Sequence, residues 1–148
     1  MTNLRYLLPL LGAAAVVLAA APGAIRQRNA GAYLLSQGKA EEAIPLLENA
    51  AGIDPNYTQA HADLCVAYFQ IKRFADAVKA CEIAVRLDPD RRTGHLNLAA
   101  TYEELERWPE AVEIYTRLLE RQPDDTAARE HLERVKLVME RSKKTEKK

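Results

Sequence analysis

Two cysteines and three histidines are the side chains here that most readily bind metals or act as nucleophiles and bases. Cys65 and Cys81 lie 16 residues apart, form no CxxC motif and have no histidine at zinc-site spacing, so no metal is predicted. His61 and His95 lie 34 residues apart, and His131 has no serine or cysteine neighbour in register. No GxSxG, HExxH or glycine-rich phosphate loop occurs. We therefore expect no enzyme, no cofactor and no small-molecule substrate.

The 34-residue distance between the two histidines is also the period of the chain. Proline and alanine keep this spacing at Pro55, Pro89 and Pro123 and at Ala43, Ala77 and Ala111. A sustained period of this length is typical of stacked helix pairs, which bury their apolar faces against one another. The pattern predicts helices near residues 26–36, 40–52, 58–70, 74–86, 92–104 and 108–121, followed by one near 126–141.

Other residues recur in the same register. They are Gly31, Leu34, Gly38 and Ala50 in the first unit; Leu64, Tyr68, Phe74 and Ala84 in the second; and Leu98, Ala99, Tyr102, Trp108 and Tyr115 in the third. Together with the prolines and alanines they resemble the tetratricopeptide repeat family. The resemblance implies an all-α fold, a right-handed superhelical stack of antiparallel helix pairs (an alpha-alpha solenoid). We expect an N-terminal hydrophobic helix before it.

The resemblance covers about residues 24–125 and divides the predicted array, residues 26–125, into three repeats. Their limits are about 24–57, 58–91 and 92–125, with a capping helix at 126–141 and a basic, disordered tail at 142–148. One departure is the fourth position of each unit, where the family often has tryptophan. This chain has Gln27, His61 and His95 there, and the shared position explains the two histidines better than catalysis does.

The register also places Cys65 and Cys81 opposite each other across one helix pair. A disulfide is therefore geometrically permitted, and it would make sense only outside the cytoplasm. The alternative is a pair of small, buried, free thiols, which we favour because free cysteine is commonly buried.

In the resembling family, the first helix of each unit lines a concave groove that holds a peptide or helix of a partner protein. Transferred by position, the resemblance implies a groove formed by Arg28, Ala32, Gln59, Ala62, Asp63, Val66, Phe69, Leu96, Asn97, Ala100, Glu103 and Arg134. Its centre is apolar and its edges are polar, which suits a segment with apolar anchors. Some family members clamp chaperone carboxylates with basic or amide side chains, but Asp63 would repel such a ligand.

The first 25 residues differ from the array. Residues 6–25 carry no charge, and twenty helical residues span about 30 Å, the thickness of a bilayer core. The segment is therefore predicted to be either a cleaved signal peptide or a single transmembrane anchor, and its length favours the anchor. The basic residues that follow the run, Arg26, Arg28 and Lys39, favour a cytoplasmic array. The short charged start before the run is typical of an export signal, and on this basis we expect the array on the extracytoplasmic side.

Charge adds one exclusion. Residues 26–140 hold 15 basic and 20 acidic side chains, and this acidic body argues against nucleic acid as a partner. The leading hypothesis is a membrane-tethered module that binds a protein segment in its groove and positions that partner in a complex. The alternative is a fixed accessory subunit of a larger membrane complex, attached through its anchor and its convex or lateral faces.

Overall fold

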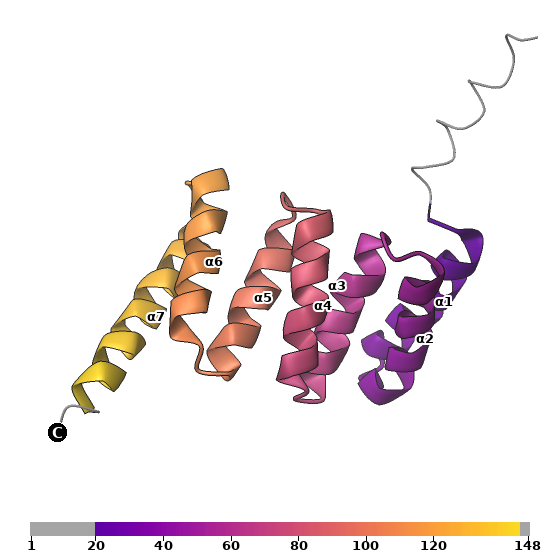
Figure 1. The fold of residues 1–148 in the computed structure, drawn as a ribbon, viewed down its shortest axis with the longest axis horizontal. Coiled ribbons are helices and arrows are strands. Elements are labelled where there is room, and N and C mark those ends of the chain that lie inside the picture. Colours follow the sequence, from indigo (N-terminus) through magenta and orange to yellow (C-terminus); the bar gives the residue numbers. More distant parts are fainter. Residues whose placement is uncertain (1–19, 146–148) are drawn as a thin grey trace, which may run out of the picture.

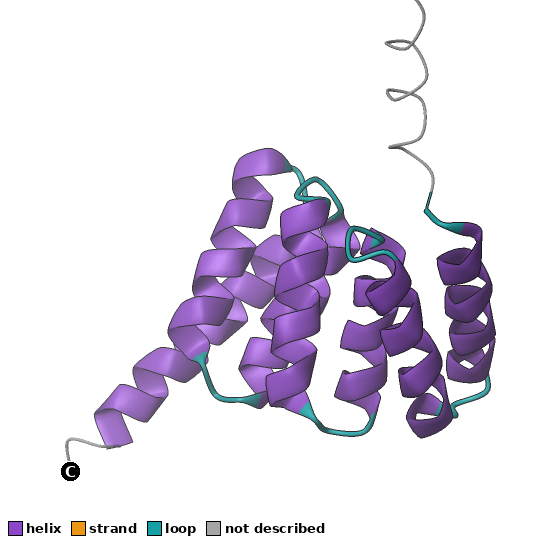
Figure 2. Cartoon of the chain, turned by 45° about the vertical axis from the view of Figure 1, so that its right-hand side comes forward, coloured by secondary structure: helices purple, strands orange, loops and turns teal. Residues whose placement is uncertain are grey.

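The computed structural model describes residues 20–145, and this part of the chain is helical apart from short connections. Its seven helices are α1 (Pro22–Ser36), α2 (Ala40–Ile53), α3 (Thr58–Gln70), α4 (Phe74–Leu87), α5 (Arg92–Glu104), α6 (Trp108–Arg121) and α7 (Thr126–Thr145). They stand side by side in chain order, and the described part contains no strand (Figures 1 and 2). The prediction of an all-α solenoid of helix pairs is confirmed.

The turn within each helix pair has the same backbone conformation. Its central residue has a positive φ in all three pairs: Gly38 at 74°, Lys72 at 60° and Glu106 at 56°. In the first turn, the N–H of Lys39 donates to the carbonyl of Leu34 over 3.0 Å, which satisfies a carbonyl at the end of α1. Only the first pair places glycine, which adopts this conformation without steric cost, at the turn.

Small side chains let the two helices of each pair approach closely. The recurring alanines Ala43, Ala77 and Ala111 have no exposed surface. A Cβ atom added at Gly31 would lie only 2.6 Å from the Cγ atom of Leu47, so the crossing of α1 and α2 leaves no room for a side chain there. Interaxial distance follows the residues at the contact, and these residues set a short one.

Cys65 on α3 faces Cys81 on α4 at the equivalent crossing of the second pair. Their sulfur atoms are bonded, their Cα atoms lie 5.0 Å apart, and both side chains are buried. The structure therefore differs from the expectation of two free thiols. The reason is geometric, because two cysteines that face each other across so close a crossing fall within bonding distance.

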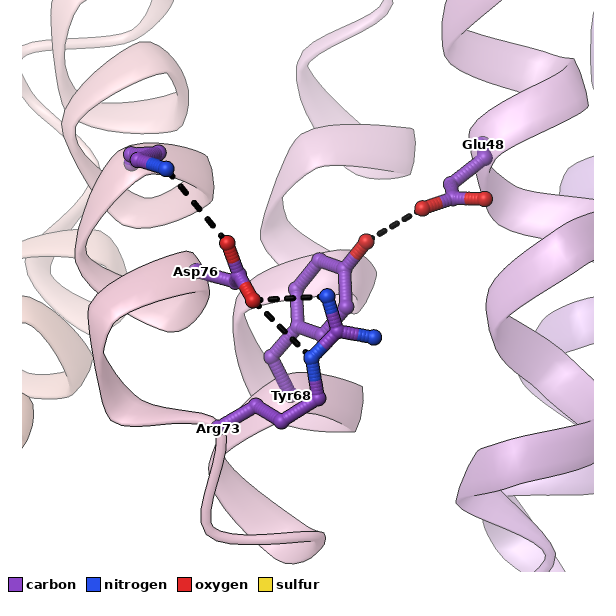
Figure 3. Close-up of polar contacts among 5 residues, drawn as sticks. Glu48, Tyr68, Arg73 and Asp76 are labelled. Carbon is purple, nitrogen blue, oxygen red and sulfur yellow. Dashed lines mark hydrogen bonds and ion pairs between the residues drawn. The ribbon is translucent and has the colours of Figure 1, made fainter.

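A tyrosine links each of the first two pairs to the pair that follows. Tyr68 on α3 donates its hydroxyl hydrogen bond to Glu48 on α2, while the Arg73 guanidinium lies 4.7 Å from the ring centre and pairs with Asp76 (Figure 3). Burial, followed by the bond to Glu48, raises the pKa of Tyr68 to about 12.

The same contact recurs one unit later. Tyr102 on α5 donates to Glu82 on α4 over 2.7 Å, and the Arg107 guanidinium lies 4.6 Å from its ring centre. The pKa of Tyr102 is likewise raised to about 12, first by burial and then by the bond to Glu82. This repeated contact fixes the register between successive pairs, since the two tyrosines occupy equivalent positions.

The last helix closes the array on one side only. Asp125 accepts the Ala128 N–H over 3.0 Å at the start of α7 and forms an ion pair with Arg92 at 2.5 Å. These bonds, the one to Arg92 first, lower the pKa of Asp125 to about 2. On the other side of α7, Leu137 is 54% exposed. The helix extends to Thr145, so residues 142–145, which the sequence analysis assigned to a disordered tail, are helical.

The predicted hydrophobic helix lies largely outside the described residues, which begin at residue 20. The last part of the apolar run, Pro22–Ile25, forms the first turn of α1, and Ala24 there is fully buried. The array therefore starts at Pro22, ahead of the predicted start at residue 26. Between residues 20 and 145, no helix combines the length and the apolar character needed to cross a membrane.

Candidate functional site

One face of the array is formed by the first helices of the pairs, α1, α3 and α5, and we call it the inner wall. Along it α1 contacts α3 and α3 contacts α5, whereas the second helices α2, α4 and α6 do not approach one another as closely. Closer spacing on one side curves the row toward that side. The helices that the sequence analysis assigned to the groove therefore lie on the concave side.

The twelve predicted groove residues all lie on this wall or on α7 beside it. Eleven are half-buried, which is the exposure expected of side chains that line a shallow groove, and Arg134 on α7 is exposed. Helix packing supports the apolar members from behind: Phe69 and Leu96 contact the core, and the Phe69 ring meets that of Phe74 edge-on, with centroids 5.4 Å apart. The apolar strip is thus built on rigid elements.

A small cavity of about 130 Å³ opens in the inner wall between α3 and α5, and we call it the side-chain pocket. It is lined by Cys65, Val66, Phe69, Asn97, Ala100 and Thr101. Four of these lining residues are predicted from the repeat register, whereas Cys65 and Thr101 are not. By register, both lie at positions that pack between helices. The sequence signal that could have identified them is that such packing positions adjoin groove positions on the same helix.

The charged groups that flank the pocket pair with each other. Arg28 on α1 donates to Asp63 on α3 over 2.5 Å, and Arg134 on α7 pairs with Glu103 on α5 over 2.9 Å. The repeat register predicts these four residues at the groove edges but does not predict that they pair. Each of the two arginines is thereby paired with a carboxylate of the same protein. Among these four residues, neither cation is free to bind an anionic ligand without breaking a pair.

Two polar groups on the wall differ in how they are satisfied. Glu103 accepts the hydroxyl of Tyr115 over 2.7 Å, and burial together with this bond raises the pKa of Tyr115. The side-chain amide of Asn97, at the pocket, has no hydrogen-bond partner among the described residues. An amide can both donate and accept, so Asn97 is suited to bond the backbone of a bound segment.

A larger and more open cleft, of about 700 Å³, lies between α4 and α6, and we call it the outer cleft. Its rim is charged, and some of these charges are paired, for example Glu113 with Arg117 at 2.5 Å. Ligand sites are usually concave and mostly apolar with a few placed polar groups. By that criterion the smaller side-chain pocket is the better anchoring site, although the outer cleft is larger.

The histidines have structural positions. His61 and His95 are buried, and their Nε2 atoms bond the carbonyls of Pro55 at 2.9 Å and Pro89 at 2.8 Å, which fixes equivalent loops. The prediction that the two occupy one repeated position is confirmed. His131 stacks on Tyr115, with ring centres 5.6 Å apart.

Comparison with known proteins agrees with this geometry. A model of the tetratricopeptide repeat matches residues 34–93 and 72–134. The structure titled first TPR of Spaghetti (RPAP3) bound to the HSP90 peptide SRMEEVD is 27% identical, with a TM-score of 0.71 over 79% of this chain and 95% of that chain. The first TPR domain of human RPAP3 is 26% identical, with a TM-score of 0.74 over 82% of this chain and 96% of that chain.

A third structure, the Sgt2 TPR domain from Aspergillus fumigatus, is 20% identical with a TM-score of 0.75 over 85% of each chain, which shows a shared fold. No curated protein sequence matches this chain.

Proposed function

Because the chain belongs to the tetratricopeptide repeat family, we propose that it is a protein-interaction module that binds an extended or helical segment of a partner along its inner wall. The observation that carries the proposal is the side-chain pocket: an apolar cavity with one unpaired amide, on the concave side of a rigid array. Apolar anchors would supply most of the affinity, and Asn97 would orient the backbone of the segment.

The similar RPAP3 structure holds an acidic HSP90 peptide, but a different peptide class fits this chain. A carboxylate clamp needs cations or amides at several wall positions. At one of these positions this chain has Asp63, and Arg28, at another, is already paired with Asp63 at 2.5 Å. An acidic C-terminus would have to displace that pair and approach a carboxylate. We therefore propose an uncharged or weakly charged segment with aliphatic anchors as the partner.

Attachment to a membrane through the apolar run at residues 6–25 is part of the proposal. The start of α1 at Pro22 modifies it, because a buried Ala24 cannot also lie in lipid. Residues 6–21 then remain for the membrane, and as a helix they would extend about 24 Å, just below the length of about 17 residues that a span needs. N-terminal sequencing of the mature protein and its extraction by alkaline carbonate distinguish a retained anchor from a cleaved signal peptide.

A second candidate function is a fixed accessory subunit of a larger complex, and the outer cleft favours it. A partner that docks there would meet a charged surface on α4 and α6 and leave the inner wall free. Arg86→Glu, on the cleft rim, would then release the complex, whereas it leaves binding at the inner wall unchanged.

Peptide selection tests the main proposal. Peptides are selected from a random library on the full chain, and their affinity is then measured for two variants that make the same change. Ala100→Glu places a carboxylate in the half-buried side-chain pocket, and Ala75→Glu places one on the exposed surface of α4. We expect at least a roughly tenfold loss for Ala100→Glu, because an unpaired buried charge is costly, and no loss for Ala75→Glu. A library without binders, or equal affinities for both variants, would contradict the proposal.

A further inference from the structure

The disulfide between Cys65 and Cys81 lies directly behind the side-chain pocket. Cys65 lines the pocket, and Cys81 reaches the same region through Thr101, whose hydroxyl lies 3.8 Å from the Cys81 sulfur. Thr101 in turn donates to the backbone carbonyl of Asn97 over 2.6 Å. A continuous set of contacts therefore joins the disulfide to the backbone of Asn97, the residue whose side-chain amide lies at the pocket.

The neighbouring helix pairs differ from the middle pair at the crossing that lies beside the pocket. At the crossing equivalent to Cys65 and Cys81, the first pair combines Gly31 with Leu47 and the third combines Ala99 with Tyr115. Leu47 and Tyr115 are both buried and fill the space between their helices. The middle pair has two small side chains instead, and a covalent bond holds its helices together without that filling.

The pocket is suited to one aliphatic side chain. Its volume is about 130 Å³, and a cavity of about 150 Å³ lined by aliphatic and aromatic side chains is known to bind benzene. Val66, Phe69 and Ala100 provide an apolar lining, and the nearest groove charges are paired as Arg28 with Asp63 and Arg134 with Glu103. An uncharged anchor such as leucine, isoleucine or methionine matches this lining.

We propose that the Cys65–Cys81 disulfide controls this pocket: the oxidised protein accepts an aliphatic anchor of its partner there, and reduction weakens that interaction. The inference rests on the proposed function, because it names the anchor and the regulation of the same inner wall. Reduction removes the covalent link between α3 and α4 and leaves two thiols at the back of the pocket. The helices can then separate, and the pocket loses the rigid wall that pre-organises it.

The chemistry is thiol–disulfide exchange with a dithiol reductant. A thiolate of the reductant attacks the Cys65 sulfur, forms a mixed disulfide and releases Cys81 as a thiolate, which takes up a proton. The second thiol of the reductant then displaces Cys65, so the dithiol is oxidised to a disulfide and both cysteines become thiols. Cys65 and Cys81 are only 2% and 1% exposed, and the pocket gives the reductant a route to Cys65.

A first experiment measures access without any partner. The full chain is reduced with dithiothreitol, and free thiols are alkylated and counted by mass spectrometry over time. Ala100→Leu fills the pocket, and Ala62→Leu makes the same change on the inner wall away from the pocket lining. We expect Ala100→Leu to slow reduction by about fivefold or more, because access controls the exchange rate, and Ala62→Leu to leave it unchanged. Equal rates for wild type and Ala100→Leu would overturn the proposed route.

A second experiment measures the control of binding. Peptides selected on the oxidised full chain are compared with versions in which the aliphatic anchor is alanine, on oxidised and on reduced protein. We expect the alanine change to cost about tenfold or more in affinity on oxidised protein and much less on reduced protein. If the peptides bind but the anchor effect is equal in both states, the redox inference fails and the proposed function stands. If no peptide binds either state, the proposed function fails, and this inference with it.

Discussion

The middle helix pair and its two neighbours solve one packing problem in different ways. All three pairs cross at equivalent positions, yet the first places Gly31 against Leu47 and the third Ala99 against Tyr115, whereas the middle pair joins two cysteines covalently. In the first and third pairs a large side chain packs against a small residue. In the middle pair neither side chain is large, and a cavity opens beside it on the inner wall.

The difference shows that a repeat can keep its backbone while the packing at one helix crossing changes. The turn conformation and the buried alanines are the same in all three pairs, so the helices remain in register. In the middle pair a covalent bond holds the two helices at the crossing where the other pairs have a large side chain, and Cys65 lines a cavity on the inner wall. Variants at these equivalent positions test this comparison.

The largest effect is expected at Tyr115, which is 2% exposed. Tyr115→Ala removes the ring that fills the third pair and its bond to Glu103, and large-to-alanine changes of buried aromatic residues cost about 3–5 kcal/mol. Urea unfolding measures the loss in the free energy of unfolding. Tyr33→Ala is the matched control, because Tyr33 is 64% exposed and should lose less than about 0.5 kcal/mol. Equal losses for both variants would contradict the packing comparison.

The next effect is expected in the middle pair. Replacing both Cys65 and Cys81 by alanine opens a loop between residues 16 positions apart, and the free energy of unfolding should fall by about 3 kcal/mol. Urea unfolding of oxidised wild type, reduced wild type and the double variant provides the measurement. Reduced wild type and the variant should unfold at similar urea concentrations. If oxidised wild type unfolds at the same urea concentration, the disulfide does not stabilise the middle pair.

The stability of the C-terminal end of the array should fall at acidic pH, because of a contact that the crossings within the helix pairs do not have. The Arg92 pair and the Ala128 N–H lower the pKa of Asp125, so its contribution to stability is complete above the ordinary carboxyl pKa of about 4 and disappears as the pH falls toward 2. At pH 7, Asp125→Asn should cost about 1 kcal/mol, because Arg92 is partly exposed. Unfolding at several pH values should show this difference vanish near pH 2. Asp124→Asn, on the exposed neighbour, is the matched control and should change the free energy of unfolding at pH 7 by less than about 0.5 kcal/mol.

The smallest effect is expected at the turns. Lys72 has a positive φ of 60° where the first pair has Gly38, so Lys72→Gly should raise the free energy of unfolding by about 0.5 kcal/mol. Gly38→Ala, the reverse change, should lower it by about 1 kcal/mol. Thermal unfolding measures both. A loss of stability in Lys72→Gly would contradict the argument that a positive φ at this turn is unfavourable for a residue other than glycine.

The sequence predicted the interior of the array well, because proline, alanine and turn residues recur at the period of the helix pair. It failed at the edges. Composition assigns Pro22–Ile25 to a separate apolar segment, and only packing shows that Ala24 is buried in the array. Local composition has the same weakness at the C-terminus, where charged residues up to Thr145 continue α7.

The pocket shows a second limit. Register placed Val66, Phe69, Asn97 and Ala100 on the inner wall, since that requires only the helix period. It could not decide between a disulfide and two thiols, because cysteine is small and buried in both states and the decision needs a distance.

The ion pairs on the inner wall were also not predicted. Arg28 pairs with Asp63 and Arg134 with Glu103, which lie 35 and 31 positions apart, and the helix period does not specify the directions of these side chains.

The most direct test of the central claim is to map a selected peptide on the full chain by methyl NMR. If the inner wall is the binding site, resonances of Val66 and Ala100 will shift on titration, while those of Val85 and Ile114 in the outer cleft will not. Shifts confined to Val85 and Ile114 would contradict the account, because they would place the partner on the opposite helices.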